Sequence, residues 1–143
     1  MKKKNNIVID TNVLVSGLRS KRGASFKLLS LIDSGKFEVN ISVPLILEYE
    51  ENAKKRTHLT AHVIEDIIDY ICKIGKERKT FYLWRPFLKD PKDDFILELA
   101  VESQSEYIIT YNKKDFKGSH QFGIKILDPK EYLIKLGELK WVH

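Results

Sequence analysis

Four acidic side chains are the residues of this chain best placed to do chemistry. One follows a short apolar run near the start, and the others lie close to the boundaries of later apolar segments. They are Asp10, Glu48, Asp93 and Asp115. Carboxylates without neighbouring histidine or cysteine are hard oxygen ligands, which suit Mg²⁺ or Mn²⁺. Because such ions bind and polarise phosphate oxygens, the acids predict a metal site that acts on a phosphate ester.

Each acid also has an ordinary structural explanation when it is taken alone. Glu48 is expected in the first turns of a helix, where a carboxylate interacts favourably with the helix dipole. Asp93 stands three residues after Asp90, which is the spacing of an N-cap and an N3 carboxylate. Asp115 has the position of a turn residue that hydrogen-bonds to its neighbours. These acids form a site only if the fold brings them to one place. Otherwise they are four separate stabilising residues.

The pattern of apolar residues predicts strands that alternate with helices. Apolar or alternating runs predict strands at 6–10, 36–42, 79–84, 106–111 and 123–127. Helical spacing predicts helices at 26–32, 45–53, 63–74 and from 91 onward. Thr60 is the expected N-cap of the third helix, and Asp90 with Pro91 is expected to begin the fourth. This alternation predicts an α/β fold with a largely parallel sheet covered on both faces.

Parallel sheets of this kind place their ligands at the carboxyl ends of the strands. Asp10 ends the first predicted strand, Asp115 follows the fourth, and Glu48 and Asp93 lie early in helices that follow strands. We therefore expect all four carboxylates to reach the same edge of the sheet.

Composition and charge limit the class of protein. A length of 143 residues, 43% of them hydrophobic, predicts one compact domain over 1–143. With no apolar run of about 18 residues and no secretory leader pattern, we expect a soluble cytoplasmic protein without a membrane segment. A single cysteine excludes a disulfide framework, and the four histidines show no metal-ligand pairing. The formal charge of +5 is compatible with a polyanionic partner such as RNA.

Three stretches together resemble a PIN domain ribonuclease. They are VIDTNVLVSGL, SVPLILEYEENAKKR and DPKDDFILELAVESQSEYIITYNKKDF. The resemblance covers most of the chain, and it is similar to the branch of this family that contains toxins of toxin-antitoxin pairs. It implies a three-layer α/β/α sandwich with about five strands. It also implies endonuclease cleavage of RNA that depends on Mg²⁺ or Mn²⁺, a homodimer, and an antitoxin protein as a partner.

The resemblance assigns catalytic roles to individual acids. The first three acids of the family pattern fall on Asp10, Glu48 and Asp93, with Asp94 as the alternative to Asp93. The implied metal ligands are Asp10, Asp93 and Asp115, acting directly or through water, and Glu48 completes the site. By this interpretation a water of lowered pKa attacks the phosphodiester in line, and no covalent intermediate is needed.

The fourth acid is where this chain departs from many relatives. They carry an acid two residues after the threonine that matches Thr110, and this chain has Asn112 there, so Asp115 is expected to supply the charge. The polar positions implied to support the first acid or contact the substrate are Thr11, Asn12, Ser16, Thr110, Asn112 and Lys113. Lys113, Lys114 and residues 19–22 are candidates to hold the RNA backbone.

Two other interpretations of the sequence are open. A phosphatase of the haloacid dehalogenase type also places an aspartate after its first strand, but that family has D-x-D where this chain has D-T-N. A non-catalytic RNA-binding or protein-binding module could keep the fold with a weakened metal site, as Asn112 suggests. Such a module should hold RNA equally well with and without divalent ions.

Overall fold

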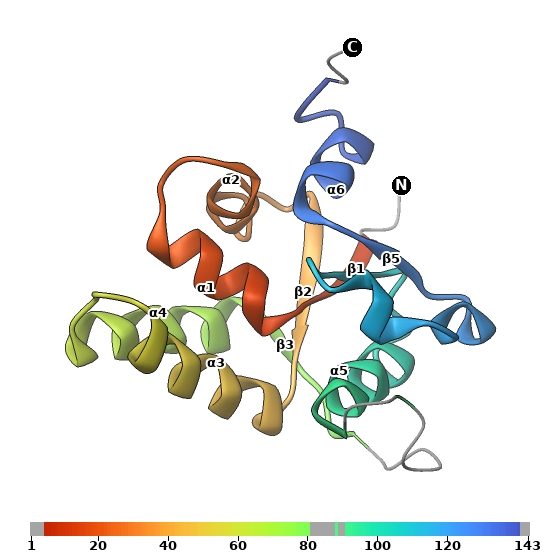
Figure 1. The fold of residues 1–143 in the computed structure, drawn as a ribbon, viewed down its shortest axis with the longest axis horizontal. Helices are drawn as coiled ribbons and strands as arrows, with labels where there is room; N and C mark the ends of the chain where they lie inside the picture. Colours follow the sequence, from red (N-terminus) through yellow and green to blue (C-terminus); the bar gives the residue numbers. More distant parts are fainter. Residues whose placement is uncertain (1–4, 81–87, 89–90, 141–143) are drawn as a thin grey trace.

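The computed structural model describes residues 5–80, 88 and 91–140, and the strands in this part of the chain form one parallel sheet (Figure 1). The strands are β1 (Asn5–Ile9), β2 (Phe37–Ile41), β3 (Lys76–Glu77), β4 (Tyr107–Ile109) and β5 (Lys125–Leu127). Their order is β3-β2-β1-β4-β5, and every pairing is parallel. This order places β1 in the centre, so that the residue after β1 lies between the carboxyl ends of two neighbouring strands.

Helices cover both faces of the sheet, as the sequence predicts. They are α1 (Thr11–Arg19), α2 (Ala24–Ser30), α3 (Val43–Arg56), α4 (Ala61–Ile74), α5 (Pro91–Glu102) and α6 (Pro129–Lys135). Val8 of β1 packs with buried residues of α3, α4 and α5. Ile7 and Ile9 face the opposite way and pack with buried residues of α1, α2 and α6. Figure 1 shows the two groups of helices around the sheet, which confirms the α/β class and the five-stranded parallel sheet.

The edge strand β3 differs from the strand that the sequence predicts at 79–84. Residues 81–84 lie outside the described residues, as does Asp90, and Lys79 and Thr80 form no strand. Instead Lys76 pairs with Asn40 and Glu77 with Ile41, directly after Gly75 ends α4. Gly75 permits this sharp entry, since an added Cβ would lie 2.9 Å from the Ile71 carbonyl oxygen. Two exposed charged residues give no apolar signal, which is why the pattern missed them.

The helix starts follow from capping side chains. The Thr60 hydroxyl accepts a hydrogen bond from the Val63 N–H at 3.3 Å, which confirms the predicted N-cap of α4. Ser42 caps α3 in the same way through the Leu45 N–H. Helix α5 begins at Pro91 as predicted. Among the described helices, none has the length and apolar character needed to cross a membrane.

Gly17 allows α1 and α2 to pack closely. A Cβ at this position would lie 2.5 Å from Leu29 Cδ1 and 3.2 Å from the Ser25 carbonyl carbon. We expect Gly17→Val to lower the free energy of unfolding by about 2 kcal/mol, because the added side chain would force the helices apart. Urea denaturation measures this loss. The double variant Gly17→Val/Leu29→Ala should recover part of it, and an unchanged single variant would contradict the close packing.

Candidate active site

Asp10 is fixed at the carboxyl end of the central strand. Its N–H donates to the Ile109 carbonyl at 2.9 Å, which continues the pairing of β1 with β4. Its side chain is the N-cap of α1, with Oδ1 accepting from the Thr11 N–H at 2.8 Å. Oδ2 accepts from the Thr110 hydroxyl at 2.6 Å. The residue is only 7% exposed, so strand, helix and side-chain contacts together hold the carboxylate in one orientation.

Thr110 connects this carboxylate to the loop that follows β4. Its hydroxyl donates to Asp10 and accepts from the Asn112 N–H at 3.0 Å. The sequence predicts Thr110 as a substrate contact. In the structure its side chain is fully buried and its hydroxyl orients Asp10.

The environment of Asp10 disfavours its ionised form. Burial raises the pKa of Asp10, hydrogen bonds from Thr110 and Thr11 lower it, and the negative charge of Asp115 raises it further, with a net upward shift. Asp115 therefore acts electrostatically on Asp10 although it is itself exposed. Ionised Asp10 would be stabilised by a cation at this edge of the sheet.

Tyr49, the residue after Glu48, lies at this edge of the sheet. The Tyr49 side chain is buried and its hydroxyl donates to the Ile9 carbonyl, directly beside Asp10. Burial raises the pKa of Tyr49 well above its usual range, and the charges of Asp10 and then Glu48 add to the shift. Sequence reasoning missed Tyr49. Leu45, Tyr49 and Ala53 follow one another at intervals of four residues along α3 and are buried. This spacing was the signal that could have placed the Tyr49 side chain on the core face of the helix.

The two aspartates in the first turn of α5 have different environments. Asp94 is 2% exposed, and its Oδ1 accepts from the Leu88 N–H at 2.8 Å, so this carboxylate connects Leu88 to the first turn of α5. Asp93 is half-buried. The sequence predicts that Asp93 lies nearer the apolar side of the helix than Asp94. The structure shows the reverse, because Asp94 is the more buried of the two. Asp93 stays the expected site acid, with Asp94 as the alternative. Glu98, one turn beyond Asp94, is also buried and was not predicted.

The remaining predicted contacts divide between a loop and a helix face. Asn112 and Asp115 are exposed, and the Asp115 N–H donates to the Asn112 carbonyl at 3.0 Å in the turn η1 (Lys113–Phe116). Lys113 forms an ion pair with Glu131, so its charge is partly compensated. Asn12 and Ser16 line a pocket along α1.

The comparison with known families shows which family this edge belongs to. A family profile described as PIN domain matches residues 6–114. The chain belongs to the PIN domain family. PIN domains are generally nucleases, typically ribonucleases, and they typically use divalent metal ions. The matched span includes Asp10, Glu48 and Asp93 and ends one residue before Asp115. No curated protein matches the chain.

The residues at this edge can be tested for their fit to the divalent ion that PIN domains use. In the described part of the chain, no three Asp, Glu, His or Cys side chains gather closely enough to hold an ion between them. Beside Asp10, however, the buried Thr11 Oγ1 and Asn12 Oδ1 have no hydrogen-bond partner among the described residues. Mg²⁺ keeps several waters and takes one or two carboxylates directly. The Asp10 carboxylate and these two oxygens therefore suit a hydrated ion, which the other acids would reach only through water.

The buried charge of this PIN domain predicts a pH-dependent effect of Asp10→Asn on stability. Because the folded pKa of Asp10 is raised, its stabilising contribution is complete only below about pH 4 and is lost as pH rises through the raised pKa. In EDTA at pH 7 the uncharged variant should melt higher than the wild type, on the order of a few degrees. The difference should shrink toward pH 4.

Thermal melts between pH 4 and pH 8 measure this effect, with Asp69→Asn as the control that removes an exposed carboxylate. An Asp10→Asn variant that melts lower than the wild type at pH 7, with no trend across pH, would show that the buried charge costs nothing.

Proposed function

We propose that this PIN domain is a metal-dependent endoribonuclease that cleaves RNA phosphodiester bonds at the carboxyl edge of its sheet. One observation carries the proposal: Asp10 is buried at the end of the central strand, oriented by two hydrogen bonds, and has a raised pKa. A carboxylate maintained in this state costs stability, so a role that uses its charge explains it better than packing does.

The proposed roles follow from where the side chains lie. Asp10, Asp93 and Asp115 would hold one or two Mg²⁺ or Mn²⁺ ions, directly or through water, and Glu48 would complete the site. A bound ion supplies a water of lowered pKa and offsets negative charge on the phosphate during in-line displacement. Thr110 and the Thr11 N–H keep Asp10 oriented and favour its ionised form. Asp94 supports the start of α5 through Leu88.

A non-catalytic RNA-binding module is the second candidate. Asn112 favours it, because a neutral, exposed amide stands where many relatives carry an acid. A weakened metal site would leave RNA binding that does not depend on divalent ions.

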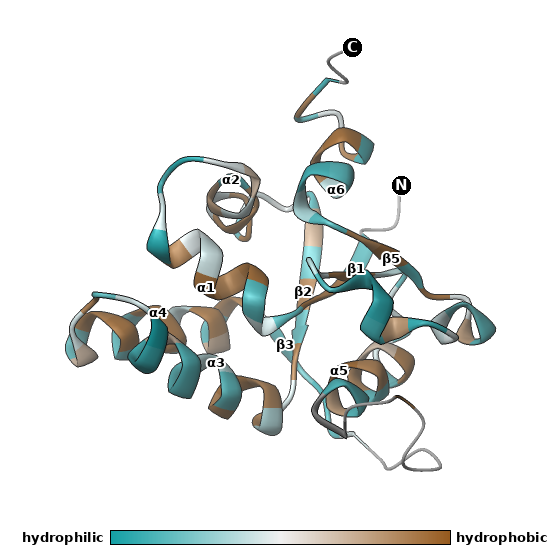
Figure 2. Cartoon of the chain, in the orientation of Figure 1, coloured by the Kyte–Doolittle hydropathy of each residue, from teal (hydrophilic) through white to brown (hydrophobic). Residues whose placement is uncertain are grey.

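We also propose that the chain is the toxin of a toxin-antitoxin pair that acts on RNA in the cytoplasm. Support comes from the start of α3, where Val43 and Leu47 are 58% and 63% exposed close to Glu48. Figure 2 shows this apolar start and the hydrophilic remainder of α3. Exposed apolar side chains beside a site suit a protein partner such as an antitoxin. A homodimer would use another surface than the core face of α4, because Ile64, Ile68 and Ile71 are buried in the core.

Cleavage of a mixed pool of structured and single-stranded RNAs tests the proposal. We expect the purified protein to cut with Mg²⁺ or Mn²⁺ and to stop in EDTA. The Asp10→Asn variant should lose activity on the order of a hundredfold or more while keeping its fold. Absence of cutting under every condition, together with RNA binding that is equal with and without the ions, would favour the binding module.

Thr110→Val tests whether ionised Asp10 is required. Because the Thr110 hydrogen bond lowers the pKa of Asp10, its loss should raise that pKa further. The acid limb of the pH–rate profile should then move to higher pH, whereas Thr110→Ser should keep the wild-type profile. A Thr110→Val enzyme with reduced kcat at every pH and an unmoved acid limb would count against this role.

A further inference from the structure

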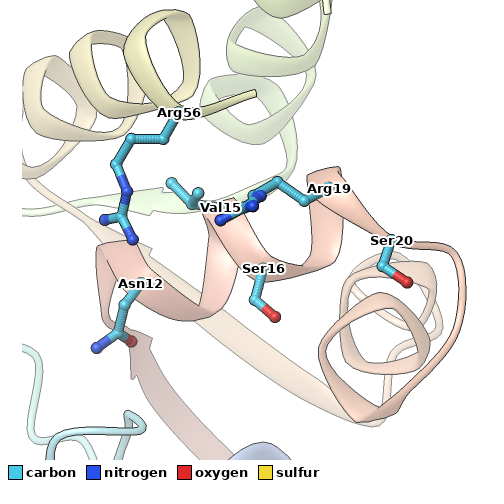
Figure 3. Close-up of a pocket in the computed structure, with 6 residues that line it drawn as sticks. All are labelled: Asn12, Val15, Ser16, Arg19, Ser20 and Arg56. Carbon is cyan, nitrogen blue, oxygen red and sulfur yellow. The ribbon is translucent and has the colours of Figure 1, made fainter. Parts of the chain in front are cut away.

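A pocket of about 320 Å³ opens along α1 next to the proposed catalytic edge (Figure 3). It is lined by Asn12, Val15, Ser16, Arg19, Ser20 and Arg56. All but Arg56 belong to α1 or its C-cap. The buried Val15 is the apolar residue in this lining, and the rest can donate hydrogen bonds.

The pocket has a fixed position relative to Asp10 because both depend on α1. Asn12, Ser16 and Arg19 are three or four residues apart, so they share one face of the helix. Asn12 lies two residues after Asp10, in the first turn. At a rise of 1.5 Å per residue, Arg19 lies about 10 Å further along the helix axis. The pocket therefore begins beside the catalytic edge and leads away from it.

Two guanidinium groups from different helices face this space. Arg19 is in the last turn of α1 and Arg56 is the last residue of α3. Figure 3 shows both side chains extending over the same face of α1. Neither makes an ion pair with another described residue, whereas Lys54 and Lys55 pair with Glu50 and Glu51. Two like charges beside one pocket repel each other, and a bound anion would relieve that repulsion.

We propose that this pocket binds a backbone phosphate of single-stranded RNA next to the phosphate that is cleaved, an inference that rests on the proposed nuclease function. Guanidinium groups bind phosphate oxygens through paired, charge-assisted hydrogen bonds. Ser16 and Asn12 lie on the same face and can add neutral donors. A contact of this kind holds the strand in register without reading its bases. The pocket thus sets substrate position, and the acid edge carries the chemistry.

The test uses the single variants Arg19→Gln and Arg56→Gln and the double variant that combines them. Lys54→Gln is the matched control. Lys54 is on α3, two residues before Arg56, and its removal changes net charge equally without touching the pocket. Cleavage of a labelled single-stranded RNA in Mg²⁺ should show KM raised roughly tenfold in each arginine variant, with kcat within about twofold. Lys54→Gln should retain the wild-type KM. Since both arginines hold one phosphate, the double variant should lose less than the product of the two single effects.

Salt dependence of binding gives a second measurement. On the Asp10→Asn background, anisotropy of the same RNA should show the slope of log K against log salt reduced by about 0.7 when the arginines are removed. Arg56→Lys, which keeps the charge and is safe for folding at this exposed position, should recover part of the affinity.

The outcomes separate the two proposals. An active wild type whose arginine variants behave like Lys54→Gln, or lose kcat at an unchanged KM, would overturn the pocket and leave the nuclease standing. A wild type that neither binds nor cuts the RNA would overturn the nuclease function and this assignment with it. Raised KM in the arginine variants alone, with a reduced salt slope, would establish the pocket.

Discussion

The placement of the Asp10 carboxylate is the constraint on which the site depends. The strand order puts β1 between β2 and β4, and the residue that ends β1 must then lie in the middle of the sheet edge, shielded from water. A carboxylate there is costly when ionised. The chain compensates only in part, through the Thr110 hydroxyl and the Thr11 N–H. The remaining cost is what a cation at this edge would offset, and this links the fold to the chemistry of the PIN domain.

The same residue also fixes the direction of α1. Because Asp10 directly follows β1 and caps α1, the helix leaves the sheet at a defined point, and Gly17 then permits close contact with α2. Every side chain on the exposed face of α1 therefore stands at a fixed distance from the carboxylate. Arg56 reaches this face from α3, whose start carries Ser42 as a cap and whose middle is buried through Tyr49. The position of Asp10 and the pocket lined by Arg19 and Arg56 thus both depend on α1.

Sequence patterns predicted the centre of the molecule better than its edges. Strands β1 and β4 are buried on both faces and have continuous apolar runs in the sequence. Strand β3 consists of two exposed charged residues, which are recognised as a strand only by their pairing with β2. The types and positions of Asp10, Glu48 and Asp93 pointed to metal chemistry. The order of burial of Asp93 and Asp94 was predicted wrongly from helical spacing, because Asp94 also contacts Leu88, which lies outside the helix. The place of Arg56 in a pocket could not be predicted either, because the other lining residues belong to α1 or its C-cap, which are distant in sequence.

The acids and the arginines of this region attract opposite charges: the acids attract a cation, and the arginines attract phosphate. A group of carboxylates binds a cation but repels RNA, so the acids alone would hold the polyanion poorly. Three lysines of this region are already in ion pairs: Lys113 with Glu131, and Lys54 and Lys55 with Glu50 and Glu51. Arg19 lies about 10 Å along α1 from Asn12, and neither Arg19 nor Arg56 has such a pair among the described residues. In the proposed arrangement the arginines would hold one phosphate, and an ion at Asp10 would offset the charge of the next.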